Sequence, residues 1–169
     1  MLTFAPTAFA KNGATTLGRA EAEVVIPIRA VPLSDLSFGS IVVGSAGRGS
    51  VEVAPDGSPP RYINTARSLC PSQSDCMPHR ASFGVSGEPS RSYRVSWPGQ
   101  IVAYGVRTGA SLTVVSLEVR SSNAPSAMGE GRLDIAGRDS FFVGGTLQVP
   151  AGTRPDVFRA ELPVIVSYN

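Results

Sequence analysis

The chain has 169 residues with 15 basic and 13 acidic side chains, so its net charge is only +2 and no nucleic-acid partner is expected. The 18 glycines and 14 prolines exclude a mainly helical protein, and 42% hydrophobic against 17% charged residues excludes a disordered tail. This length suits one domain with one core. No apolar run approaches the roughly 20 residues of a membrane-spanning helix, so no membrane span is expected.

The elements expected along the chain are short strands. Apolar residues alternate with period two in brief runs that end in turn residues, as in an antiparallel sandwich or barrel. In chain order, the expected strands are residues 23–31, 36–38 with 41–43, 50–54, 61–63, 81–85, 92–97, 101–106, 111–120, 132–135, 141–149 and 157–168.

Three details accompany these strands. In residues 111–120, the side chains of Val115, Leu117 and Val119 are expected to share one face. The glycine-rich residues 44–49 predict a hairpin turn, and Gly144-Gly145 predicts a bulge or tight bend.

Two cysteines, Cys70 and Cys76, lie in a polar loop and predict a local disulfide. One alternative is a metal site with His79 as third ligand, although the cysteine spacing is unusually wide and no fourth ligand is evident. The other alternative is a pair of reduced thiols in a cytosolic protein.

Catalytic patterns are missing from the sequence. There is one histidine, no nucleophile elbow, no zinc-binding His-Glu-x-x-His helix and no phosphate-binding loop, so we expect no enzyme, no catalytic residue, no metal and no cofactor. Glu130, Asp134 and Asp139 are interpreted as solvated turn residues. Tyr93 and Trp97 are a candidate ligand platform, against the alternative that both belong to the core.

The last expected strand has an apolar face. Leu162, Val164, Val166 and Tyr168 alternate up to the penultimate residue, and we expect this face to pack on the core. Pro163 has the opposite parity and removes a ladder donor, which places the strand at a sheet edge or at a bulge. An edge with so little charge calls for a cover.

Several motifs are shared with a known family. Leu-Ser-Phe-Gly at 36–39, Val-Gly-Gly-Thr-Leu at 143–147 and the runs 49–53, 82–87, 93–95, 131–137 and 164–169 resemble the bacterial family called domain of unknown function 4402. That family is itself similar to spore-coat-U-type and archaic chaperone-usher pilins. Ala160, where the family tends to have glycine, and the Cys70 to Cys76 loop depart from its pattern.

The resemblance implies an exported immunoglobulin-like β-sandwich, reaching the cell surface through the periplasm and completed there by a donated N-terminal strand. Residues 1–19 would be an N-terminal extension and residues 20–169 the sandwich. Leu2, Phe4, Ala8 and Ala10 alternate as a donor strand requires, and the alternative is a remnant of an export leader. The implied acceptor or chaperone-binding edge is the apolar face of the last strand.

The function expected on this basis is that of a structural subunit of a surface filament, with other copies of the chain, a periplasmic chaperone and an outer-membrane usher as partners. The alternative is a self-complete secreted adhesin or carbohydrate-binding module.

Overall fold

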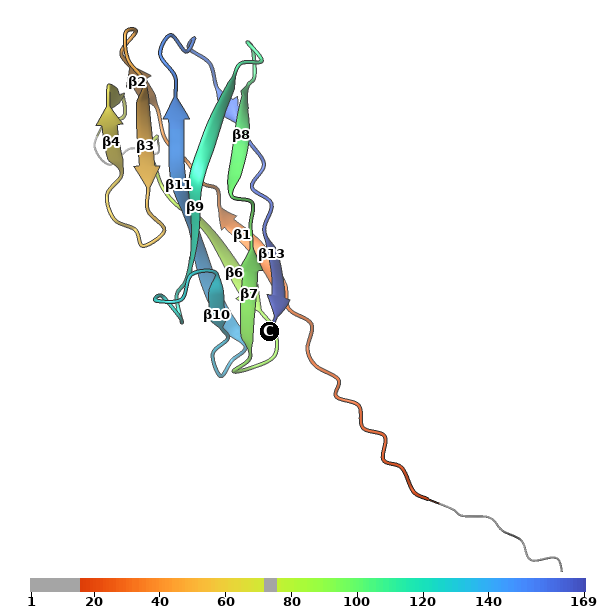
Figure 1. The fold of residues 1–169 in the computed structure, drawn as a ribbon. Helices are drawn as coiled ribbons and strands as arrows, with labels where there is room; N and C mark the ends of the chain where they lie inside the picture. Colours follow the sequence, from red (N-terminus) through yellow and green to blue (C-terminus); the bar gives the residue numbers. More distant parts are fainter. Residues whose placement is uncertain (1–15, 72–75) are drawn as a thin grey trace, which may run out of the picture.

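The fold is all-β, as expected. In this computed structural model, which describes residues 16–71 and 76–169, the described chain forms antiparallel strands and no helix (Figure 1). The strands are β1 (Arg29–Ser34), β2 (Ile41–Val43), β3 (Gly49–Val53), β4 (Arg61–Asn64), β5 (Ala66–Ser68), β6 (Ala81–Ser86), β7 (Ser92–Ser96), β8 (Gln100–Gly105), β9 (Ser111–Ser121), β10 (Glu130–Arg132), β11 (Arg138–Val149), β12 (Phe158–Arg159) and β13 (Ile165–Tyr168).

The larger sheet is built around the long strand β11. One edge of β11 pairs with β9, and beyond β9 lie β8 and β12. The other edge of β11 pairs with β6 before Gly144 and with β3 after it, so the sheet branches at Gly144. β1 pairs with the outer edge of β6, and β4 pairs with the outer edge of β3. A Cβ at Gly144 would collide with the carbonyl oxygen of Val53 and lie 2.6 Å from the nitrogen of Pro55. Only glycine therefore lets β3 end against β11 at this point.

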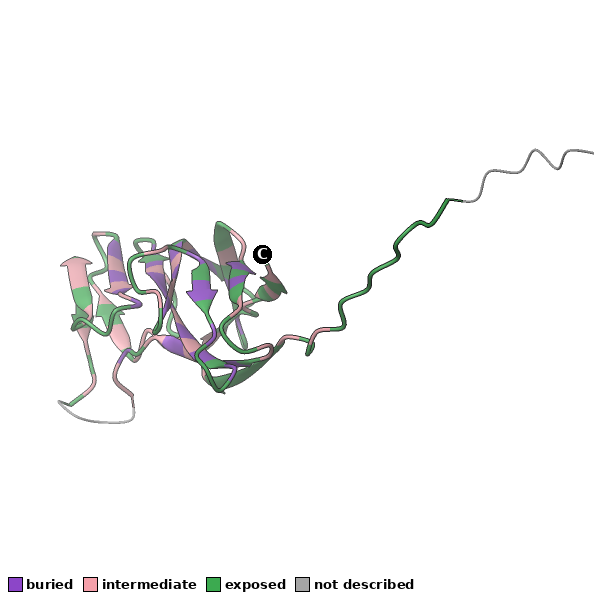
Figure 2. Ribbon diagram, turned by 90° about the horizontal axis from the view of Figure 1, so that it is seen from below, coloured by how far each residue is buried: buried purple, intermediate pink, exposed green. Residues whose placement is uncertain are grey.

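A second sheet, β10-β7-β13, covers part of the first, and β2 pairs with β5 in a separate ribbon. Buried apolar residues of both sheets form one core cluster, and Figure 2 shows the buried positions along the strands. Tyr93 and Val95 of β7 meet Phe141 and Val143 of β11 in this core, all at most 3% exposed. The arrangement is a sandwich with one core, the architecture expected from the short alternating strands.

The irregularity expected at Gly144-Gly145 is confirmed, and its extra residue belongs to the partner strand. Gly144 pairs with Glu118 and Thr146 with Val115, so β9 carries one more residue than β11 between these pairs. Ser116 takes up this residue with a φ of 51°. At the bulge, the parity of the buried residues of β9 changes from even to odd. Val114 is therefore buried on the core side, and Val115 does not share the face of Leu117, contrary to expectation.

Other differences concern where strands begin and pair. Residues 44–49 form a turn but no hairpin, because β2 pairs with β5 and β3 pairs with β4 and β11. The expected strand at residues 157–168 is two strands in two sheets: β12 pairs with β8, the chain crosses over at residues 160–164, and β13 pairs with β7. Strand β5 was not expected, and β1 begins six residues after the predicted start at residue 23.

Candidate functional site: an open edge between the two sheets

The C-terminal residues present one apolar face to the core. Leu162, Val164, Val166 and Tyr168 are half-buried and pack against the core cluster, as the alternation predicts, while Ile165 on the opposite face is 69% exposed. β13 is the last strand of its sheet, which agrees with the edge position expected from Pro163.

The outer edge of β13 has unpaired backbone groups. On β7, the N–H of Val95 bonds to Gly129 on the β10 side, whereas the carbonyl of Ser92 accepts a bond from Asn169. Along a strand, the backbone N–H and C=O groups of successive residues point to opposite neighbouring strands. The even-numbered residues of β7 therefore direct their backbone groups toward β13, where Arg94 pairs with Ser167. The N–H and C=O groups of Val166 therefore point away from β7, where no described strand pairs with them.

The facing edge of the larger sheet is also uncovered. Ala30 and Pro32 of β1 pair with Val85 and Phe83 of β6, whose side chains belong to the core, so Ala30 and Pro32 lie on the core-facing side. Both are nevertheless exposed. The sandwich is thus open between β1 and β13, and we call this boundary the open edge.

The lower end of the open edge is tied by Tyr168. Its hydroxyl accepts a hydrogen bond from the N–H of Glu88 (2.6 Å) and donates one to the carbonyl of Ile26 (2.7 Å). The Glu88 carboxylate in turn accepts from the N–H of Ile26 at 2.8 Å, and the Arg91 guanidinium lies 5.2 Å from the Tyr168 ring centroid. These contacts hold the start of β1 beside the end of β13.

The cysteine loop contains the predicted disulfide between Cys70 and Cys76. Both sulfurs are consumed by this bond, which leaves neither as a thiolate for the alternative metal site. His79 is exposed, and its backbone forms a bridge with Ser37. Over residues 16–71 and 76–169, no group of three or more potential metal-ligating side chains is present.

The aromatic pair proposed as a ligand platform lies inside the protein. Tyr93 is 0% exposed, so its ring has no face available to a sugar. Trp97 is half-buried, its ring packs over Gly129, and its Nε1 donates a hydrogen bond to the carbonyl of Leu117 at 2.8 Å. The alternative interpretation of these residues as core is the one that matches their positions.

The interpretation of Asp139 as a solvated turn residue was wrong. Asp139 is 9% exposed, and its carboxylate accepts hydrogen bonds from the hydroxyls of Tyr93 (2.8 Å) and Ser121 (2.5 Å) and from the N–H of Asn123. Gly131, which pairs with Tyr93, makes room for the ring to cross β10, because a Cβ there would overlap it. Burial, followed by the hydrogen bond and charge of Asp139, raises the pKa of Tyr93.

The Tyr93–Asp139 hydrogen bond, which we call the brace, joins β7 to β11 and was not recognisable in the sequence. Asp139 is 46 residues from Tyr93, and it stands beside Gly137 and Arg138 in a stretch that looks like an ordinary polar turn. Its one local signal is that it precedes the apolar residues of β11 with the parity of the buried face.

The predicted donor residues Leu2, Phe4, Ala8 and Ala10 lie outside the described residues. What the structure does describe is the adjoining segment, residues 16–25, which leaves the body as an extended chain (Figures 1 and 2). Among the described residues, no helix is long and apolar enough to span a membrane.

Comparison with known proteins identifies a family. The model of the family described as "Domain of unknown function (DUF4402)" matches residues 27–168, which include every strand of the described fold. Neither the curated proteins nor the solved structures contain a significant match. The chain therefore belongs to the DUF4402 family of domains of unknown function.

Proposed function

We propose that this protein is an exported structural subunit of a bacterial surface filament, assembled by strand donation at the open edge. The observation that carries the proposal is that core-facing residues on both sides of this edge, Ala30 and Pro32 on β1 and Val166 and Tyr168 on β13, remain partly or wholly exposed. A sandwich that is complete by itself would cover them.

The sequence of β13 also supports a covered edge. Exposed edges are normally blunted by shortness, charge or proline, and β1 carries both Arg29 and Pro32. β13 is short, with four residues, but it carries neither charge nor proline, since its residues are Ile165-Val-Ser-Tyr168. An added strand would satisfy the outward N–H and C=O groups of Val166 and bury apolar surface at about 25 cal/mol per Å².

The proposal includes partners and a compartment. Other copies of the chain supply the strand in the filament, and a periplasmic chaperone and an outer-membrane usher would protect the edge before assembly. The Cys70–Cys76 disulfide supports export, because such bonds persist in oxidising compartments.

Two substitutions at one position test the proposal. Val166→Ala and Val166→Pro both shorten the same half-buried side chain, but only proline removes the outward N–H. In each case the N–H groups that bond β7 belong to Ser167 and Ile165 and are retained. We expect wild type and Val166→Ala to form SDS-resistant ladders on an unheated gel, and Val166→Pro to remain monomeric with an unchanged circular dichroism spectrum. Monomeric wild type, or ladders from all three, would contradict strand addition at this edge.

A further inference from the structure

We propose that the outer face of the larger sheet binds an acidic polysaccharide, one that carries a carboxylate on successive sugar units. The site is a shallow hollow of about 450 Å³ at the lower end of β1, β6 and β11, rimmed by Ser122, Asn123 and Asp134 (Figure 1). The outward residues of these strands line it, on the side of the sheet opposite to the core. The hollow therefore uses none of the unpaired groups of the open edge, and the inference stands apart from the proposed function.

Gly84 forms the floor of the hollow. The strand register places Val31 on one side of it and Ser140 on the other, and all three residues face outward. A Cβ at Gly84 would lie 3.5 Å from the nearest Val31 carbon, which is an ordinary contact, so this position could hold a side chain but has none. Val31 is 54% exposed and gives the hollow an apolar wall. A bare floor beside an apolar wall lets the C–H face of a sugar ring approach the sheet closely.

The polar groups around this floor have free hydrogen-bonding capacity. The N–H of Ser122 bonds to the carbonyl of Ser140 at 2.8 Å, which holds Ser122 at the rim. Among the described residues, the hydroxyls of Ser86, Ser122 and Ser140 make no hydrogen bond, and neither does Oδ1 of Asn123. The Nδ2 group of Asn123 donates to two backbone carbonyls at 2.9 and 3.1 Å, which fixes that free oxygen in place. Three hydroxyls and an amide oxygen match the hydroxyl groups of a sugar.

Two arginines give the hollow its preference for anions. Arg29 and Arg138 pair with Ser86 from opposite sides, so their side chains share its face, about 10 Å apart across two strand spacings. Both are exposed, and within the described part of the chain neither guanidinium makes an ion pair or a hydrogen bond. A free guanidinium binds a carboxylate through two parallel hydrogen bonds. Two of them on one face fit a polymer with repeated carboxylates better than a single small anion.

Two carboxylates at the hollow favour a carboxylate ligand over a phosphate monoester. Oδ1 of Asp134 accepts the N–H groups of Ala136 and Arg138, both at 2.8 Å, and the carboxylate of Asp139 accepts four hydrogen bonds, one of them from the Tyr93 hydroxyl. Their negative charges repel a ligand in proportion to its own charge. A singly charged sugar acid is therefore penalised less than a phosphate that carries nearly two charges.

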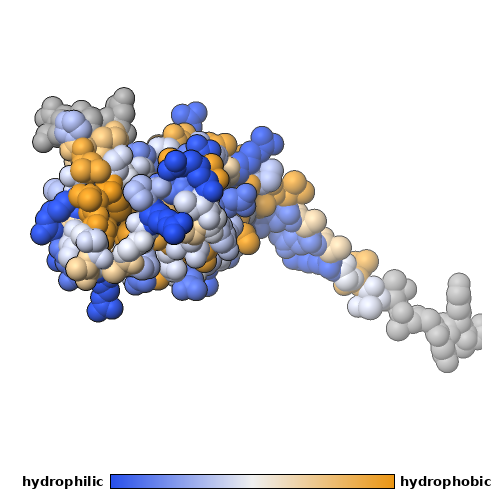
Figure 3. All heavy atoms as spheres, turned by 90° about the horizontal axis from the view of Figure 1, so that it is seen from above, coloured by the Kyte–Doolittle hydropathy of each residue, from blue (hydrophilic) through white to orange (hydrophobic). Residues whose placement is uncertain are grey.

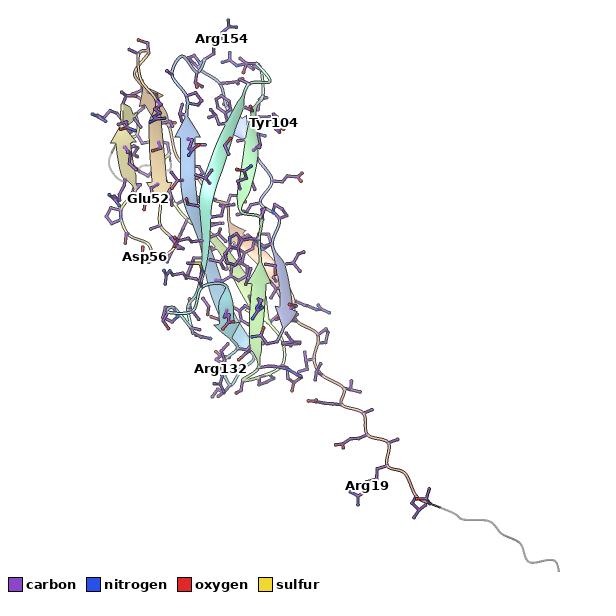
Figure 4. All side chains as sticks on the ribbon, viewed as in Figure 1. Arg19, Glu52, Asp56, Tyr104, Arg132 and Arg154 are labelled. Atoms are coloured by element: carbon purple, nitrogen blue, oxygen red, sulfur yellow. A yellow bond between two sulfur atoms is a disulfide. The ribbon has the colours of Figure 1, made fainter. Side chains whose placement is uncertain are left out.

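Arg154 provides a matched control for the arginines of the hollow. It is exposed and, among the described residues, makes no ion pair or hydrogen bond, but it lies beyond the far end of β11, at the opposite end of the sandwich (Figure 4). Figure 3 views that end from above and shows hydrophilic residues there as well. Replacing Arg154 therefore removes the same charge from a hydrophilic surface that lacks the hollow.

Isothermal titration calorimetry of the full chain tests the site. The probes are tetramers of galacturonic acid and of mannuronic acid, and the methyl ester of each is the uncharged comparison with the same hydroxyls. We expect wild type and Arg154→Ala to bind an acid tetramer equally well, and Arg138→Ala and Arg29→Ala each to bind it about tenfold more weakly or worse. The methyl esters should bind wild type at least about tenfold more weakly than the acids.

Gly84→Val separates binding from folding. The valine side chain fills the hollow, whereas a β-branched residue suits a strand, so binding should be lost while the thermal unfolding midpoint stays the same or rises. Full affinity in Gly84→Val would overturn the proposal. So would equal affinity for acid and ester, equal losses in Arg138→Ala and Arg154→Ala, or no binding of either acid at millimolar concentration. Tighter binding of tripolyphosphate than of either tetramer would reveal a phosphate site instead and would also overturn it.

Discussion

At the residue scale, a buried carboxylate joins the two sheets. The carboxylate of Asp139 on β11 accepts a hydrogen bond from the hydroxyl of Tyr93 on β7, and the Tyr93 ring passes over Gly131 of β10 to reach it. Charge-assisted hydrogen bonds of this kind are worth more than neutral ones, and a buried carboxylate that loses a donor is costly. The brace fixes β7, and β7 is the strand against which β13 pairs.

Tyr93→Phe should therefore lower the free energy of unfolding by about 1–3 kcal/mol, because Asp139 loses one of its donors in a buried site. Tyr62→Phe is the matched control, since the Tyr62 hydroxyl is buried without a hydrogen-bond partner in the described structure. Removing that hydroxyl should be neutral or slightly stabilising. Urea unfolding measures both, and equal losses for the two variants would contradict the role given to the brace.

The raised pKa of Tyr93 adds a pH dependence of known sign. The folded state keeps the phenol protonated to higher pH than the unfolded state does, so the stabilisation is complete below about pH 10 and falls as the pH rises further. Urea midpoints between pH 9 and 11 should decline in wild type and decline less in Tyr93→Phe. A steeper decline in the variant would be inconsistent with this account.

A second carboxylate, that of Asp156, joins two loops through hydrogen bonds at the opposite end of the sandwich. Asp156 accepts hydrogen bonds from the hydroxyl and the N–H of Thr108, both at 2.7 Å, and from the N–H groups of Arg107 and Val157. The Thr108 hydroxyl is the largest cause, with backbone donors adding to it, and together they hold the pKa of Asp156 well below its usual range. The contacts join the turn after β8 to the loop before β12.

Asp156→Asn should therefore be less stable than wild type at pH 6, and the difference should shrink as the pH falls below 4. The unfolded state takes up a proton there before the folded state does, so wild type loses this stabilisation while the variant has none to lose. Urea midpoints at pH 6 and pH 3 give the comparison. A gap that widens in acid would refute the assignment.

At the element scale, the long strands β9 and β11 are shaped by one glycine pair. Gly144 admits the end of β3, and Gly145 lies against Leu117 and Val114, the two buried residues that flank the β9 bulge. The bulge lets β9 keep a buried face along its whole length despite the extra residue.

Gly144→Ala should lower the free energy of unfolding by about 3 kcal/mol or more, because the added methyl meets backbone atoms that have no room to move. Gly99→Ala is the control, since a Cβ at Gly99 has no neighbour within 4 Å. Thermal unfolding of the two variants decides the matter. A Gly144→Ala protein as stable as Gly99→Ala would show that the branch point tolerates a side chain.

Local patterns predicted much of the fold and less of its connections. Period-two alternation located β3, β6, β7 and β8 to within one or two residues, and it placed Leu162 through Tyr168 on one face. It could not show that residues 157–168 divide between two sheets, because the alternation continues across the crossover. Neither could it reveal the β9 bulge, since the choice between Val114 and Val115 as the buried residue depends on the register with β11.

The candidate site divides in the same way. The apolar face of the last strand and the disulfide were visible in the sequence, because both depend on residues that are close together in the chain. The edge position of the last strand was also expected, from Pro163. The part that β1 plays in the open edge was not, because β1 and β13 are more than 130 residues apart in the chain. Asp139 shows the same limit, since its partner Tyr93 comes from the opposite sheet.

At the scale of the whole molecule, the two strands that border the open edge differ in their sequences. β1 is blunted by Arg29 and Pro32, whereas β13 offers an uncharged edge beside half-buried apolar side chains. The extended residues 16–25 leave from the end of the molecule where Ile26 is hydrogen-bonded to Tyr168. In the proposed assembly, a strand supplied by one copy to the open edge of the next would make a head-to-tail interface, and such an interface propagates into a filament when it does not close into a ring.

The most direct measurement is hydrogen exchange of the β13 amides in the assembled protein, read after exchange is quenched and the filament dissolved. The Val166 amide points to the open edge, and the neighbouring Ser167 amide already bonds to β7 and serves as the internal reference. The account predicts that assembly slows exchange at Val166 to a rate similar to that at Ser167. Exchange at Val166 that stays as fast in the filament as in the monomer would contradict strand donation at this edge.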